Sequence, residues 1–215
     1  MIKKIFSFTL ILNLLIFSCS SDSDDNSSEV WEQKSEMLTN WADNFIIPSY
    51  TTLTNKLVIL EESGNTFAIS RNQQNLENLR NSFINAYLSW QYVEMFDIGL
   101  AEETYYKSKM NIYPTTVSRI ELNIQNGNTD FNNSNNYAAQ GFPALDYLLY
   151  GIENSDELIL SKFNNEPQYL TYLLNLINQM LQNTYPIVED WQNYRNPFIG
   201  SVRNTATSSV NKMTN

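Results

Sequence analysis

Residues 167–191 read PQYLTYLLNLINQMLQNTYPIVEDW, and apolar side chains recur in this stretch every three or four positions. That spacing places them on one face of an α-helix. Pro167 stands near the start, where a proline suits the first helical turn. Pro186 is expected to bend or break the helix, because proline lacks a backbone N–H. The apolar positions are Leu170, Leu173, Leu174, Ile177, Leu181, Tyr185, Val188 and Trp191.

Two earlier stretches show the same period. Over 31–60 the apolar residues continue past Pro48, which predicts a long helix that bends at this proline and ends at Gly64. The second stripe runs over 76–90, and its aromatic residues are expected to pack in the core. Shorter helices are predicted at 115–124, 142–150 and 156–163. The fold class is therefore all-α, an antiparallel helical bundle with long kinked helices and a crossover of short helices.

Two segments depart from this pattern. Residues 123–136 are rich in asparagine and contain Gly127, which is typical of an exposed loop. Residues 208–215 resemble the first turns of another amphipathic helix, whose apolar face begins at Val210 and Met213. We therefore expect a truncated chain that lacks further helices.

The composition excludes several classes of function. The chain has 215 residues, enough for one ordinary domain, and a formal net charge of −10. So acidic a chain does not suit nucleic acid, whose phosphates are bound by Lys and Arg. The absence of histidine excludes Ser-His-Asp catalysis, His-ligated zinc and His-ligated haem. The single cysteine, Cys19, allows no internal disulfide, so a metal would need oxygen ligands.

The N-terminus has the pattern of an export signal. Lys3 and Lys4 precede an apolar run over 5–17 that is too short to span a bilayer. Ser18 and Cys19 follow it directly, which resembles a bacterial lipobox. We expect residues 1–18 to be a lipoprotein signal peptide and Cys19 to become the lipid-modified N-terminus. The alternative is a chance cysteine in an ordinary signal peptide.

An acidic, non-periodic segment follows the cysteine. Residues 19–29 carry Ser, Asp and Asn and predict a disordered tether between membrane and domain. An acidic run after a lipidated cysteine also resembles the signals that send lipoproteins to the outer face of the outer membrane. A plain spacer is the other interpretation. The expected location is the cell envelope, as an outer-membrane lipoprotein on the periplasmic or the outer side.

The order of these segments resembles a known family. The residues that carry the likeness are Tyr113–Glu121 (YPTTVSRIE) and Gly141–Gly151 (GFPALDYLLYG), after a lipobox and a proline-bent first helix. They are similar to the imelysin family of bacterial lipoproteins and periplasmic proteins, a family linked to iron acquisition and also classed with metallopeptidases. The resemblance implies a helical domain over 30–215 that corresponds to the N-terminal part of a longer family domain.

The family's hallmark is G-x-H-x-x-E. On this sequence its three positions fall on Gly141, Pro143 and Asp146, so the histidine is replaced. A purely structural interpretation also fits these residues. Pro143 suits a first helical turn, and Asp146 near the helix N-terminus would be stabilised by about 0.3–1 kcal/mol. Gly151 would then cap the C-terminus of the helix.

Four carboxylates are candidate metal ligands: Glu94, Asp97, Glu121 and Asp146. If they converged in one cavity, an oxygen-rich site for a hard cation such as iron or calcium would result. Solvated helix faces on an acidic protein are the alternative. The cofactor is otherwise unknown, although iron or another oxygen-ligated cation is compatible with these residues.

Three functions follow from these observations. The first is a lipid-anchored envelope protein related to iron acquisition, which binds a ligand or partner protein without catalysis. The second is a metallopeptidase of the imelysin type, although its motif lacks the histidine. The third is a degenerate structural or interaction module, whose partner would cover exposed apolar helix faces.

Overall fold

The computed structural model describes residues 28–203 and 205–214, and every regular element within those ranges is a helix. The predicted signal peptide 1–18 and Cys19 lie outside the described residues. The all-α prediction is confirmed. None of the described helices has the length and apolarity that a bilayer crossing requires.

The first long helix is continuous and consists of α1 (Ser28–Trp41), η1 (Ala42–Ile46) and α2 (Ile47–Ile69). Its first two residues, Ser28 and Glu29, belong to the predicted tether and are helical instead. The element η1 is a π-helical turn, and it lies directly before Pro48 in the first turn of α2. The helix thus changes its winding at the predicted bend.

Gly64 does not end this helix, contrary to the sequence-based prediction. The helix continues to Ile69, and Gly64 is buried on the face of α2 that meets α9. A Cβ atom at this position would lie 3.0 Å from Ile177 Cδ1. Gly64 therefore serves close helix packing, which a single sequence cannot distinguish from a helix stop.

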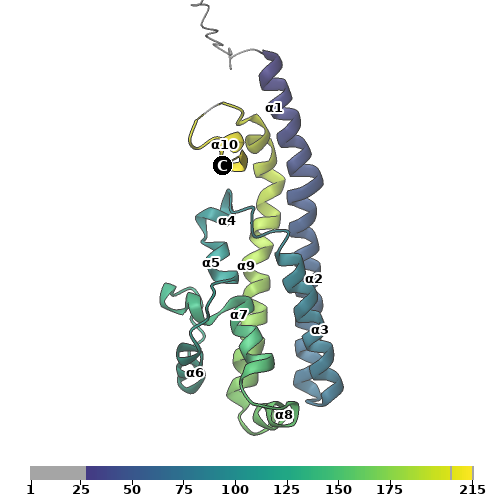
Figure 1. Cartoon of the computed structure of the whole chain (residues 1–215), viewed down its shortest axis with the longest axis vertical. Coiled ribbons are helices and arrows are strands. Elements are labelled where there is room, and N and C mark those ends of the chain that lie inside the picture. The colour runs from purple at the N-terminus through teal and green to yellow at the C-terminus, as the bar shows by residue number, and fades with distance from the viewer. Residues whose placement is uncertain (1–27, 204, 215) are drawn as a thin grey trace, which may run out of the picture.

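Three long segments form the bundle core. The helix α3 (Gln73–Trp90) follows α2 after three residues and returns antiparallel to it. The third is α9 (Pro167–Gly200), which runs opposite to α1 and α2, as Figure 1 shows. Because α2 packs against both α3 and α9, its buried leucines lie at the centre of the bundle.

Pro186 does not break α9, which extends for 34 residues through this proline and through Pro197. An interior proline costs about 3 kcal/mol in a helix. Buried side chains on both sides of Pro186, among them Leu181, Ile187 and Trp191, favour the continuous helix and offset that cost.

The crossover between α3 and α9 lies along one side of α9 in Figure 1. Its elements are α4 (Leu100–Glu103), α5 (Tyr106–Met110), α6 (Val117–Asn126), η2 (Ser134–Ala139), α7 (Gly141–Asp146), η3 (Tyr147–Gly151) and α8 (Asp156–Asn165). After α9 the chain forms α10 (Ser209–Thr214), whose Val210 and Met213 pack against the core. The apolar face predicted for this segment is therefore used within the described structure.

The asparagine-rich segment is only partly an exposed loop. Asn123 lies in α6 and Asn136 in η2, and both are buried. Asn123 Nδ2 donates to Asn136 Oδ1 at 3.1 Å and to the hydroxyl of Tyr172 at 3.3 Å. These amides join α6, η2 and α9, because each buried polar group must find a partner.

Candidate functional site

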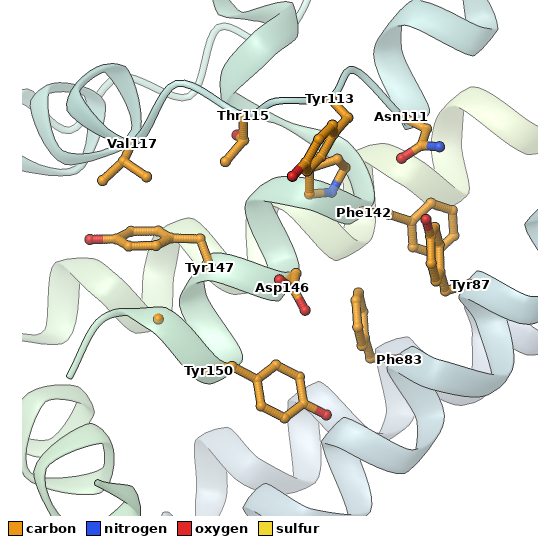
Figure 2. Close-up of a pocket in the computed structure, with 12 residues that line it drawn as sticks. Phe83, Tyr87, Asn111, Tyr113, Thr115, Val117, Phe142, Asp146, Tyr147 and Tyr150 are labelled. Carbon is orange, nitrogen blue, oxygen red and sulfur yellow. The ribbon is translucent and has the colours of Figure 1, made fainter. Parts of the chain in front are cut away.

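A cavity of about 490 Å³ lies where the crossover meets α3. Its walls come from α3, from the connection that precedes α6, and from α7 with η3, and Figure 2 shows their side chains around one open space. Six of the twelve lining residues are aromatic. The lining residues are Phe83, Tyr87, Asn111, Tyr113, Thr115, Val117, Phe142, Pro143, Asp146, Tyr147, Tyr150 and Gly151.

Gly141 fixes the start of α7 against α5. Its φ is +72°, and a Cβ atom there would lie 2.1 Å from the carbonyl oxygen of Met110. Only glycine fits this backbone conformation at this distance. The next residue, Phe142, is buried, and its ring lies 5.2 Å from that of Tyr87 and 6.0 Å from that of Trp90. The hallmark glycine therefore places one wall of the cavity.

Arg80 joins α3 to the end of η3. Its Nε and Nη2 donate to the carbonyl oxygen of Leu149 at 3.0 and 2.7 Å, and its guanidinium forms an ion pair of 2.7 Å with Asp156. Hydrogen bonds from Arg80 hold the pKa of Asp156 below its usual value. The same guanidinium lies 4.5 Å from the ring centroid of Tyr150. One cation thus orients the Tyr150 wall of the cavity.

Glu121 orients the opposite wall. Its carboxylate accepts a hydrogen bond of 2.6 Å from the hydroxyl of Tyr147 and a second from the hydroxyl of Tyr169. Burial, and then the bond to Glu121, raises the pKa of Tyr147 above its usual value. Glu121 is absent from the cavity lining, and its role here is to hold two tyrosines from η3 and α9.

Among the described residues, Asp146 is the only charged one that lines the cavity. Figure 2 shows its side chain projecting into the open space between Phe83 and Tyr150. It makes no hydrogen bond or ion pair with any residue of the described chain. Partial desolvation therefore raises the pKa of its carboxyl above the usual value.

The structural interpretation of the motif needs two corrections. Asp146 is the last residue of α7, so the positive end of the helix dipole does not account for its position. Gly151 ends η3 without a left-handed backbone, so it is not a glycine cap of the usual kind. Pro143 does lie in the first turn of α7, as expected.

The four predicted metal ligands do not share one place. Glu94 lies 3.7 Å from the ammonium of Lys107, Glu121 binds two tyrosines, and only Asp146 lines the cavity. Across the described residues no three His, Cys, Asp or Glu side chains are grouped so that they could hold a metal ion. The fourth candidate, Asp97, is exposed, and partial desolvation raises its pKa.

A resident metal ion does not fit the donors of this cavity. The position of the motif histidine is occupied by Pro143, which offers no side-chain ligand, and Asp146 supplies one carboxylate. Hard cations such as calcium take six to eight oxygen ligands, and a structural or catalytic zinc takes three or four protein ligands. Metal binding by Asp146 alone stays a prediction without structural support.

The family resemblance identifies Asp146, Pro143 and Gly141, but no pattern in the sequence predicts that aromatic side chains line a cavity beside them. The helical stripe over 76–90 predicts core positions for both Phe83 and Tyr87, and of the two only Phe83, at 5% exposed, is buried. Tyr87 is 38% exposed because it faces the cavity. The helical period identifies the residues on the inner face of a helix, but it does not show which of them line a cavity instead of packing in the core.

Comparison with known proteins agrees with this architecture. The family model of imelysin, peptidase family M75, matches residues 46–215. A solved structure from Parabacteroides distasonis, described as a "putative iron-regulated protein A precursor", is similar with a TM-score of 0.68 and 16% identity. An imelysin-like protein from Psychrobacter arcticum is similar with a TM-score of 0.65 and 16% identity.

These likenesses cover 83% and 85% of this chain, which spans 57% of each solved chain. At such identity they show the fold alone. Among curated proteins, none matches the chain. The match of the family model over residues 46–215 confirms the resemblance that the Gly141–Gly151 segment carries. The chain belongs to the imelysin family.

Proposed function

We propose that this protein is a lipid-anchored binding protein of the outer membrane that contributes to iron acquisition and acts without catalysis. The observation that carries the binding role is the cavity with its single carboxylate, Asp146. The similarity to the Parabacteroides protein, which is described as iron-regulated, supports the connection with iron. The lipobox at Cys19 supports the anchor.

The chemistry of the lining favours binding over catalysis. Acid–base and nucleophilic mechanisms use a second group that exchanges a proton with the first. Asp146 forms no hydrogen bond with such a group among the described residues. The hydroxyls of Thr115 and Tyr147 donate elsewhere, to the carbonyl of Ala138 at 2.8 Å and to Glu121. The remaining lining is mostly aromatic, which suits a ligand that buries apolar surface.

A cavity-filling variant tests the binding role. Val117 and Leu122 are both exposed apolar residues of α6, but only Val117 lines the cavity. The full-length protein, purified in detergent, is titrated with ferric citrate, haem and a ferric hydroxamate complex that carries a free ammonium group, while its thermal midpoint is recorded. We expect at least one of these ligands to raise the midpoint of the wild type and of Leu122→Trp, but not of Val117→Trp.

Two outcomes would contradict the binding role. One is the absence of any shift with the whole panel. The other is an equal shift in Val117→Trp, which would place the ligand elsewhere on the molecule.

The anchor is tested at Cys19. Expression in a Gram-negative host with an alkyne-labelled fatty acid should label the wild type and place it in the membrane fraction. Cys19→Ser should lose the label and leave the membrane fraction. A wild-type protein that remains unlabelled and soluble would remove the anchor from the proposal while leaving the cavity untouched.

Peptidase activity has less support, because the donors around Asp146 do not fit a catalytic metal. Incubation with casein in the presence of zinc or calcium is expected to give no cleavage. Cleavage that disappears in Asp146→Asn would instead favour the peptidase.

One observation favours a second candidate, an interaction module. Ile84 and Leu88 on α3, with Tyr92 and Met95 after it, are 45%, 55%, 70% and 70% exposed. Ile84 and Leu88 are four residues apart in α3 and so lie on one face of it, and Tyr92 and Met95 lie in the turns that follow. Exposed apolar side chains grouped along a short stretch of chain favour a protein partner. Light scattering after size exclusion tests this candidate, since a strict monomer that recruits no envelope protein would contradict it.

A further inference from the structure

We propose that the cavity around Asp146 takes a small organic cation, an amine or a quaternary ammonium, held by ring faces and the carboxylate. The inference deepens the proposed function, on which it rests, by naming the class of ligand. The lining contains one unpaired negative charge, that of Asp146, together with six aromatic side chains.

The charge of the lining selects a cation. Asp146 is the only ionised residue of the lining, and no Lys or Arg takes part in it. Arg80, which lies against the ring of Tyr150, is not a lining residue and is paired with Asp156. A neutral ligand would leave the Asp146 carboxylate partly desolvated and without a partner, which is unfavourable. A cationic ligand supplies that partner.

The rings form a connected wall. Phe83 lies 6.1 Å from Tyr87, 6.2 Å from Phe142 and 6.3 Å from Tyr150, measured between ring centroids. The planes of Phe83 and Tyr87 are parallel within 4°. Faces of Tyr and Phe rings attract a cation within about 6 Å of their centroids. Several such faces lie beside the single carboxylate.

The walls are also held in place before any ligand arrives. The guanidinium of Arg80 lies 4.5 Å from the ring centroid of Tyr150, and Glu121 fixes the hydroxyl of Tyr147. A binding site whose side chains are already ordered loses less conformational entropy when the ligand enters. Arg80 and Glu121 therefore hold Tyr150 and Tyr147 in position at the cavity.

An organic cation suits this lining better than a bare metal ion. A metal ion must exchange its hydration shell for several oxygen ligands, and aromatic carbon cannot supply them. An alkylammonium ion is weakly hydrated and carries apolar surface that gains from burial against Phe83 and Phe142. One carboxylate is then enough to balance its single charge.

The test compares a cation with a neutral molecule of the same shape. Full-length protein in detergent is titrated calorimetrically with choline and with its neutral isostere dimethylbutanol, and benzyltrimethylammonium serves as a larger cationic probe. We expect choline to bind about tenfold more tightly than dimethylbutanol. Asp146→Asn should weaken choline by about tenfold and leave dimethylbutanol unchanged.

Two matched variants separate the contributions of charge and ring. Asp130→Asn removes one negative charge from an exposed loop outside the cavity and should not change binding. Tyr150→Leu should weaken choline about threefold more than dimethylbutanol, whereas Tyr150→Phe keeps the ring and should bind like the wild type.

The inference is overturned if dimethylbutanol binds as well as choline, if Asp146→Asn binds choline normally, or if neither cationic probe binds. The first two results would leave the cavity as a ligand site, so the binding role would survive. The Val117→Trp titration with iron ligands judges that role separately, so a failure of the cation does not count as a failure of the function.

Discussion

The bundle and the crossover satisfy their buried polar groups in different ways. In the bundle the buried hydroxyls of Thr54, Ser82 and Thr184 each donate to the carbonyl four residues earlier in the same helix, and those of Ser82 and Thr184 also bond to the hydroxyls of Ser63 and Tyr106. In the crossover the buried amides of Asn123 and Gln140 reach across the chain, the latter to the carbonyl of Phe131 at 2.9 Å. The bundle is therefore stabilised mainly by many similar apolar contacts, whereas the crossover depends on a few specific hydrogen bonds.

The cavity lies between these two regions, with α3 on one side and α7 and η3 on the other. Its shape therefore depends on the single contacts that position the crossover. A small substitution at one of those contacts should therefore cause a large loss in the free energy of unfolding, whereas a similar substitution elsewhere should not.

The largest effect is expected at Gly141. In Gly141→Ala the new methyl group would meet the Met110 carbonyl at 2.1 Å in a backbone conformation with φ of +72°. We expect a loss of about 4 kcal/mol in the free energy of unfolding, measured by urea denaturation. Gly127→Ala is the matched control, because its φ is +63° and no atom lies within 4 Å of the new methyl. It should cost about 1 kcal/mol, and equal losses in both variants would remove the special status of the α5–α7 contact.

A smaller effect is expected at Arg80, where α3 holds the crossover. Arg80→Met keeps the aliphatic stem but removes both donors to Leu149 and the ion pair with Asp156. The expected loss is about 2 kcal/mol at neutral pH. Arg119→Met, at an exposed position of α6, should change stability by less than about 0.5 kcal/mol.

The pH dependence of the Arg80 variant sharpens this prediction. The pKa of Asp156 is lowered by Arg80, so the ion pair contributes fully above the ordinary pKa of an aspartate. Its contribution is lost as the pH falls through the lowered pKa. The stability difference between wild type and Arg80→Met should therefore shrink in acid. A difference that stays constant through that range would mean that the Leu149 bonds alone hold the wall.

The same contrast explains which parts of the fold could be predicted from sequence. The apolar period over 167–191 predicts α9, because the bundle depends on many residues that repeat one simple rule. Pro186 does not interrupt α9 and Gly64 does not end α2, because tertiary packing outweighs local helix preference at both positions. In the crossover the buried partners of Asn123 are 13 and 49 residues away, and composition alone suggests an exposed loop.

The candidate site shows the same limit. Asp146 could be found only because its segment resembles a family motif, and nothing local marks it as the one charge of an aromatic cavity. Tyr87 and Asn111 join it from segments that carry no motif. Their assembly depends on Gly141 and Arg80, whose contacts are set by tertiary structure.

A third, smaller effect is expected at Tyr172, where α9 meets the crossover. Its hydroxyl donates to the carbonyl of Ala139 at 2.7 Å and accepts from Asn123. Tyr172→Phe should cost about 1.5 kcal/mol, because two buried polar groups lose a partner. Tyr185→Phe, on the same helix but 43% exposed, should be neutral within about 0.5 kcal/mol. Equal urea midpoints for the two variants would show that the crossover does not depend on this bond.

The smallest effect is expected at Asp146, and its sign is opposite to the others. Partial desolvation raises the pKa of this carboxyl in the folded protein, so ionisation opposes folding. Stability is therefore highest below the ordinary aspartate pKa and falls as the pH rises through the raised value. Asp146→Asn, which stays neutral, should be more stable than the wild type at neutral pH by on the order of a few tenths of a kcal/mol, since solvent screens an exposed carboxylate.

The pH profile distinguishes this effect from a simple change in packing. The gain of Asp146→Asn should vanish in acid, where the wild-type carboxyl is also neutral, and Asp130→Asn should show no such gain. Burial raises the pKa of Tyr147 and of Tyr150, so these two cavity tyrosines stay neutral over this range. If Asp146→Asn were instead destabilising at neutral pH, the carboxylate would have a stabilising partner in the free protein. The cavity would then lose the uncompensated charge that makes it suitable for a cation.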